Sequence, residues 1–115
     1  MNNIEFKNPD QIINMGGPWV GNLYINEIEI DNKIIINNYL EDTDFYYFVK
    51  YFEVSKKQRD NFFCIVRTNK RNLVSKISKE KFEKIYIRDI KENILFYSEG
   101  FHKNLPIINL ILNFY

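Results

Sequence analysis

Alanine is absent from this chain of 115 residues. Because alanine is the best helix former, its absence disfavours long helices. The three prolines are scattered, and no internal repeat, linker or low-complexity segment divides the sequence. A chain of this length has the size of one domain, about 100–150 residues, and buries roughly two thirds of its unfolded surface. The sequence therefore predicts a single domain over residues 1–115.

Cysteine and histidine occur once each, as Cys64 and His102. One cysteine excludes an internal disulfide, and with it the small disulfide-stapled secreted domains. One thiol and one imidazole also fall short of the three or four ligands of a zinc-type site. Cys64 lies within the apolar run 62–66, where a structural thiol is typical, so a catalytic pair of Cys64 and His102 is disfavoured. We expect no catalytic residue, no metal site and no cofactor, and hence not an enzyme.

Long apolar runs are also missing. Residues 1–7 lack the apolar stretch of a signal peptide. The most apolar stretch, residues 105–112, is far shorter than the ~20 residues that a membrane-spanning helix needs. The sequence predicts a cytoplasmic protein with no membrane partner.

Aromatic and β-branched residues are abundant instead, with 17% aromatic and 45% hydrophobic residues. This composition excludes a disordered chain and favours strands. Period-two alternation recurs: Ile28 and Ile30 fall on one side of their segment, and Ile85 and Ile87 on one side of theirs. Residues 62–66 are continuously apolar, which is typical of a strand buried on both faces.

Short strands joined by turn-rich segments predict an all-β fold, an antiparallel meander, sandwich or barrel-like sheet with at most one short helix. The helix candidate is Ser78–Lys84, although it lacks the Glu or Gln of a capping box. The expected strands are residues 3–6, 19–25, 28–31, 34–39, 45–54, 61–68, 72–77, 82–90, 94–100 and 107–114.

The string Gly16-Gly17-Pro18-Trp19-Val20-Gly21 is the most unusual local feature. A phosphate-binding glycine loop would need a following helix, whereas this string runs into a predicted strand. We therefore expect a tight turn with positive φ at Gly16 or Gly17, Trp19 as a large core residue, and Gly21 at a bulge or a close approach.

Charge is divided between the two parts of the chain. Residues 1–49 carry eight acids and two bases, whereas residues 50–115 carry fourteen bases and seven acids, for a total of +1. Like charges gathered on one face steer a charged macromolecule toward it. An antiparallel sheet that mixes the two parts in space would cancel this asymmetry, so both outcomes stay open.

Bases and aromatic residues interleave in the second part, which is one sign of a nucleic-acid surface. The nearly neutral total charge argues against it, because nucleic-acid domains have a strong basic balance. Lysines that guard strand edges and turns explain most of these positions. Nucleic-acid binding is disfavoured for the set Lys56, Lys57, Arg59, Arg67, Lys70, Arg71, Lys79, Lys81, Lys84 and Arg88, with Phe82 and Tyr86.

Six acids form the candidate partner-binding set: Glu27, Glu29, Asp31, Glu41, Asp42 and Asp44. The first three share one face of their expected strand, and the other three follow within a few residues. They lack the spacing and glycine of a calcium loop, and no enclosing cleft argues for a pair of glycosidase acids. A patch that mimics phosphate charge and covers a basic partner surface fits these residues, and so does a solvated sheet edge.

Three strings, GGPWVGNLYIN (16–26), NNYLEDTDFYYFVKY (37–51) and ILFYSEGFHK (94–103), resemble bacterial immunity proteins of polymorphic-toxin and contact-dependent growth inhibition systems. The resemblance covers under half of the chain and carries over no functional residue. It implies a small cytoplasmic protein that binds and blocks one cognate toxin domain, often a nuclease with a basic groove.

The expected function is therefore a non-enzymatic protein-binding inhibitor that uses the acidic set. Two alternatives stay open. A closed barrel lined by Phe and Tyr would carry a small apolar ligand, and an aromatic sheet face would bind RNA or a single strand.

Overall fold

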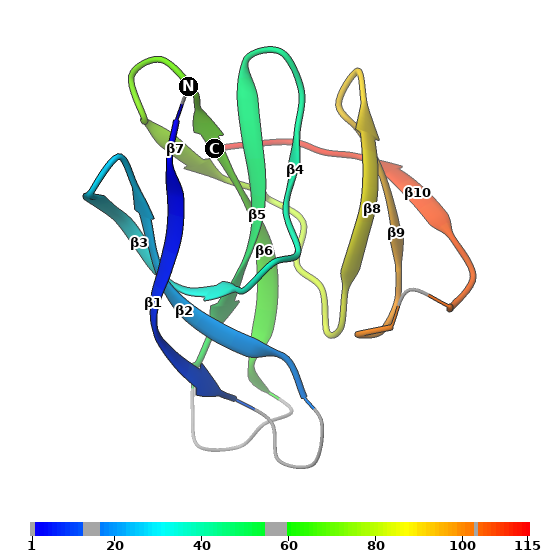
Figure 1. Cartoon of the computed structure of the whole chain (residues 1–115). Helices are drawn as coiled ribbons and strands as arrows, with labels where there is room; N and C mark the ends of the chain where they lie inside the picture. The colour runs from blue at the N-terminus through cyan, green and yellow to red at the C-terminus, as the bar shows by residue number, and fades with distance from the viewer. Residues whose placement is uncertain (1, 13–16, 55–59, 103) are drawn as a thin grey trace.

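The computed structural model describes residues 2–12, 17–54, 60–102 and 104–115, which form ten strands (Figure 1). The strands are β1 (Ile4–Gln11), β2 (Trp19–Ile25), β3 (Ile28–Ile35), β4 (Leu40–Glu41), β5 (Phe45–Phe52), β6 (Phe62–Asn69), β7 (Ser75–Ile77), β8 (Tyr86–Lys91), β9 (Ile94–Ser98) and β10 (Ile108–Ile111). No α-helix occurs among these residues, so the all-β prediction is confirmed.

The strands make two antiparallel sheets. The larger sheet has the order β1-β2-β3-β5-β6-β7, with β4 also paired to β5. The smaller sheet has the order β10-β9-β8. Most neighbours in the sheets are also neighbours along the chain, as in a meander. The larger sheet stays open, because no pairing between described residues joins β1 to β7.

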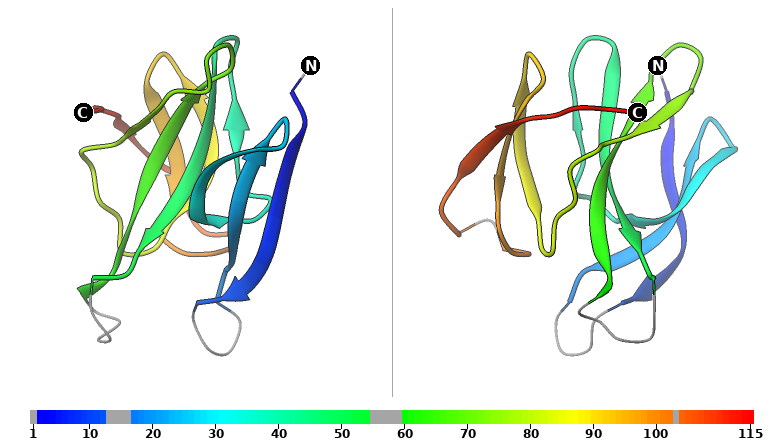
Figure 2. Two further views of the ribbon diagram at one scale, coloured as in Figure 1. Left: turned by 90° about the vertical axis from the view of Figure 1, so that its left-hand side faces the viewer. Right: turned by 180° about the vertical axis from the view of Figure 1, so that it is seen from behind.

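β5 and β6 form the middle of the molecule and are buried on both faces. Figure 2 shows these two strands between β1–β3 on one side and β8–β10 on the other. Along β5, Tyr46 and Phe48 pack with β2 and β3 in one core, while Tyr47 and Val49 pack with β8 and β9 in the other. The prediction that residues 62–66 are buried on both faces is confirmed for residues 63–66, which are at most 3% exposed, whereas Phe62 is half-buried.

Aromatic side chains supply much of both cores. Phe63 lies against Tyr51, with ring centroids 5.2 Å apart, in the core that faces the smaller sheet. Tyr39 and Phe48 are 5.3 Å apart in the other core. Full burial of one such side chain stabilises a fold by about 1.5–3 kcal/mol. The aromatic-rich composition is therefore accounted for largely by these two cores.

The two sheets are joined by a buried amide. Asn38 is 8% exposed, and its side chain accepts from the N–H of Ile87 (3.2 Å) and donates to the Ile87 carbonyl (3.1 Å). The side-chain amide of Asn38 therefore bonds both the N–H and the carbonyl of Ile87, as the backbone of a neighbouring strand would. This bond fixes the segment before β4 against the start of β8.

The helix expected over Ser78–Lys84 does not form. The N–H of Ser78 donates to the carbonyl of Ile65, and Phe82 exchanges two backbone hydrogen bonds with Phe63. These bonds extend the edge of β6 and leave the backbone without helical i→i+4 partners. The strand bounds also shift: β1 continues to Gln11, β7 begins at Ser75 and β8 begins at Tyr86.

Gly21 lies at a close backbone approach, as predicted. A Cβ built on Gly21 would lie 2.9 Å from the carbonyl oxygen of Lys7, and the register between β2 and β3 shifts beside it. The expected turn at Gly16 falls outside the described residues. Trp19 is not a core residue: its side chain is 52% exposed, so the prediction of burial is wrong.

Candidate functional site

The first three acids of the candidate set do not share one strand face. Glu27 lies in the turn between β2 and β3, where Asn26 and Glu27 have φ values of 53° and 69°, typical of a tight hairpin turn. A bulge places Glu29 opposite Tyr24 and Asp31 opposite Leu23. This bulge breaks the strict alternation on which the prediction rested. Ile28, placed by the pattern on the side opposite the acids, is 57% exposed.

Asp31 is engaged inside the fold. It forms an ion pair with Lys50 of β5, and its side chain is 23% exposed. Lys50 also donates to the side-chain oxygen of Asn32 at 3.1 Å. The carboxylate of Asp31 is thus neutralised by a base from the second part of the chain.

Asp42 shapes the turn between β4 and β5. Its Oδ1 accepts from the N–H groups of Asp44 (3.0 Å) and Phe45 (2.8 Å), and its Oδ2 accepts from the hydroxyl of Tyr47 (2.8 Å). Partial burial opposes ionisation, but these hydrogen bonds and the nearby Lys70 outweigh it, so the pKa of Asp42 lies below its ordinary value. Burial, together with Asp42, raises the pKa of Tyr47. Asp42 is therefore a structural residue of the turn.

Lys70 ties this turn to the rest of the molecule. Its ammonium lies 3.4 Å from a carboxylate oxygen of Glu41 and donates to the backbone carbonyl of Asp42 at 2.6 Å. Its own carbonyl accepts from the side chain of Asn2 at 3.1 Å. The side-chain oxygen of Asn2 in turn accepts a hydrogen bond from the side-chain amide of Asn26, the residue before Glu27. A continuous set of hydrogen bonds therefore connects the β2–β3 turn to the β4–β5 turn.

Three of the six acids remain exposed and outside ion pairs among the described residues: Glu27, Glu29 and Asp44. The carboxylate of Glu29 accepts a hydrogen bond from the hydroxyl of Tyr24, at 3.1 Å. Glu92, in the turn between β8 and β9, lines the same small depression as Asp42 and Asp44. We call Glu27, Glu29, Asp44 and Glu92 the acidic end. Glu92 belongs to the basic part of the chain, so the sequence alone gave no reason to group it here.

The charge asymmetry is partly cancelled in space. Lys50 and Lys70 come from the basic part and pair with Asp31 and Glu41 of the acidic part. Lys33 and Glu53 pair in the opposite sense, at 3.4 Å. The asymmetry is therefore cancelled at some acids, whereas Glu27, Glu29 and Asp44 stay exposed.

Several bases lie over the protein's own aromatic rings. The guanidinium of Arg67 lies between Phe45 and Phe114, 4.4 Å and 4.1 Å from their ring centroids. Lys81 lies 4.6 Å from the centroid of Phe62. Phe82, one of the two aromatic residues interleaved with these bases, is buried at 7% exposure. Lys56, Lys57 and Arg59 lie outside the described residues.

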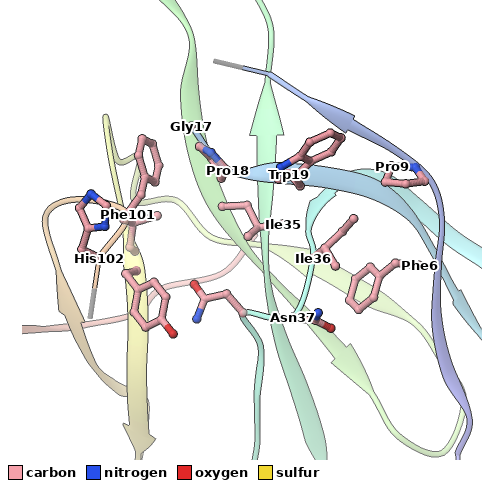
Figure 3. A pocket seen from close by; sticks show the side chains of 13 residues that line it. Phe6, Pro9, Gly17, Pro18, Trp19, Ile35, Ile36, Asn37, Phe101 and His102 are labelled. Carbon is pink, nitrogen blue, oxygen red and sulfur yellow. The ribbon is translucent and has the colours of Figure 1, made fainter. Parts of the chain in front are cut away.

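A second candidate site is a groove of about 860 Å³ between the two sheets (Figure 3). Phe101 and His102 lie on one side of it, Phe6 and Trp19 lie on the other, and Ile35 and Ile36 lie between them. Each of the three strings that carried the family resemblance contributes to its lining: residues 17–19, 37–38 and 101–102. We call this cavity the Trp19 groove.

Cys64 and His102, the two residues weighed as a catalytic pair, differ in exposure. Cys64 is 3% exposed, as predicted for a structural thiol, and burial raises the pKa of Cys64. His102 is exposed at the Trp19 groove. No group of three His, Cys, Asp or Glu side chains in the described ranges is placed to share a metal ion.

Comparisons with known proteins add no relative to this picture. No protein-family model, no curated protein and no solved structure matches the chain. Within the described residues, no helix has the length and apolar character needed to span a membrane.

Proposed function

We propose that the protein is a non-enzymatic protein-binding inhibitor, an immunity protein that neutralises a cognate bacterial toxin in the cytoplasm of the producing cell. The observation that carries the proposal is the acidic end, where Glu27, Glu29, Asp44 and Glu92 are exposed. Carboxylates that point to solvent raise the local negative potential, which favours the approach of a basic partner. A nuclease toxin, whose groove binds phosphate, is the partner class that this charge suits best.

The acidic end is held in place by the fold. Tight turns carry Glu27 and Glu92, and Asp42 fixes the turn that carries Asp44. Because these positions are ordered before binding, little conformational entropy is lost when a partner docks. This preorganisation is what an inhibitor needs if it is to bind tightly through a small surface.

The two alternative functions have less support. A closed barrel would enclose a carrier site, whereas the larger sheet is open. A stacking platform for RNA needs exposed rings beside the bases, and of the two aromatic residues interleaved with the basic set, Phe82 is buried.

The proposal is tested by capturing the partner from the producing bacterium and assaying the toxin with purified inhibitor. The variant Asp44→Lys/Glu92→Lys reverses two charges at the acidic end. The matched control Glu83→Lys/Glu99→Lys reverses two exposed acids that line a different depression, and it changes the net charge by the same amount. We expect the first variant to lose most of its inhibition and the control to keep it. Equal inhibition by both variants, or capture of no protein partner, would contradict the proposal.

A further inference from the structure

The Trp19 groove has features that the proposed function does not use. Gly17, Pro18 and Trp19 line it at the start of β2, and the turn between β4 and β5 lies at the other end of the molecule from the start of β2 (Figure 1). A partner docked on the turn that carries Asp44 would therefore contact the opposite end of the molecule from the start of β2. Ligand binding in the groove can therefore be tested separately from the immunity function.

The walls of the groove are apolar and aromatic. Trp19 is 52% exposed at its rim, although an indole ring gains more than most side chains from leaving water. The ring of Phe101 is held edge-on against Phe63 of the core, with centroids 5.5 Å apart. Phe6 is anchored from the other side against Phe48, with centroids 6.5 Å apart. The core thus fixes two facing aromatic walls, and Trp19 extends beyond them into solvent.

The polar groups of the groove are few. Among the described residues that line it there is no Asp, Glu, Lys or Arg. The amide of Asn38 is fully used by Ile87. The hydroxyl of Tyr86, the amide of Asn37 and the imidazole of His102 make no side-chain hydrogen bond within the described part of the chain. These three groups are free to bind a polar substituent.

We propose that the Trp19 groove binds an uncharged small molecule built on a planar aromatic ring that carries a hydrogen-bonding substituent. Its volume of about 860 Å³ lies within the usual range for ligand sites, about 300–1,000 Å³. Apolar walls with a few polar groups that fix orientation are typical of such sites. A charged ligand would lose part of its hydration without meeting an Asp, Glu, Lys or Arg side chain in the lining, which favours an uncharged ligand.

NMR titration tests this directly, because the chain contains one tryptophan and one histidine, each of which gives a single side-chain reporter. The probe is p-cresol, and the matched controls are 4-methylcyclohexanol, which keeps the hydroxyl without the aromatic ring, and the charged 4-hydroxybenzoate. We expect p-cresol to shift the Trp19 indole and His102 signals saturably, with a Kd of about 0.5–10 mM. Both controls should bind at least about fivefold more weakly.

Variants locate the site. Trp19→Ala should weaken the binding of p-cresol at least about fivefold, as measured from the shift of the His102 signal. Tyr86→Phe should weaken p-cresol binding about two- to fivefold, because the variant lacks the hydroxyl. Val74→Ala, at an exposed valine in the turn between β6 and β7, is the matched control and should change nothing.

Four outcomes would overturn the proposal. The first is the absence of saturable shifts in the millimolar range. The second is binding of 4-methylcyclohexanol as tight as that of p-cresol. The third is binding of p-cresol that is unaffected by Trp19→Ala. The fourth is binding of N-acetyl-tyrosine amide at least tenfold tighter than p-cresol, which would identify an aromatic side chain of another protein as the occupant.

Discussion

Asp42 is the residue whose removal should cost the most stability among the six acids of the candidate set. Its carboxylate accepts two backbone N–H groups and the hydroxyl of Tyr47, a residue that is only 1% exposed. Asp42→Ala deletes the turn bonds, worth about 0.5–2 kcal/mol in comparable capping positions. It also leaves a largely buried hydroxyl without its acceptor, which costs about 1–3 kcal/mol. We expect a loss of about 2–4 kcal/mol in the free energy of unfolding.

Urea denaturation of Asp42→Ala and Asp44→Ala measures this loss. Asp44 is the matched control, because it lies two residues away and its side chain forms no ion pair among the described residues. Asp44→Ala should change stability by no more than about 0.5 kcal/mol. Tyr47→Phe combined with Asp42→Ala should cost less than the two single changes added, because they share one hydrogen bond. If Asp42→Ala and Asp44→Ala are equally stable, the structural role assigned to Asp42 is wrong.

The same site predicts an acid dependence. Because the pKa of Asp42 is lower in the folded protein than in the unfolded chain, its ionised form stabilises the fold. This contribution is complete above the unfolded pKa, about 3.9, and is lost as the pH falls through the lower folded value. The stability difference between the protein and Asp42→Asn should therefore shrink between about pH 5 and pH 2.

Three further predictions concern the interior. Gly21→Ala should destabilise the fold by about 1–3 kcal/mol in denaturant titration, since its Cβ would meet the carbonyl of Lys7 at 2.9 Å, and an unchanged midpoint would refute that close approach. Asn38→Ala should lower the free energy of unfolding by about 2–4 kcal/mol, because the N–H and the carbonyl of Ile87 both lose their partner. A decrease below about 0.5 kcal/mol would show that the amide does not join the sheets. Cys64 should react with a thiol reagent at least about a hundredfold more slowly in the native protein than in denatured protein, and a fast native reaction would contradict its burial.

The strands could be predicted because alternation and turns are local signals. The continuous apolar run 62–66 also predicted correctly that β6 is buried on both faces. The fate of residues 78–82 was not predictable in this way. Whether their backbone forms a helix or pairs with β6 depends on contacts with Phe63 and Ile65, which are distant in sequence.

The candidate sites depended even more on distant contacts. The sequence predicted Glu27, Glu29 and Asp44 as partner-binding residues, and the structure leaves them exposed. The sequence showed no sign of the bulge that turns Asp31 toward Lys50, or of the fold that places Glu92 beside Asp44. Trp19 was misassigned because a large apolar residue at the start of a strand suits a core and a groove rim equally well. The Trp19 groove is lined by segments that are distant in sequence, so it could not be predicted from any one of them.

The association rate of the cognate partner is the most direct test of the acidic end. It should be measured at about 0.01 M and about 0.15 M ionic strength, where the Debye length falls from about 30 Å to about 8 Å. At low salt, Asp44→Lys/Glu92→Lys should slow association by about tenfold or more, with a smaller change in dissociation, and this difference should shrink at high salt. Reversal of Lys79, Lys81 and Lys84 and the Glu83→Lys/Glu99→Lys control should have much smaller effects. An association rate that ignores both the salt concentration and the Asp44→Lys/Glu92→Lys change would contradict docking through the acidic end.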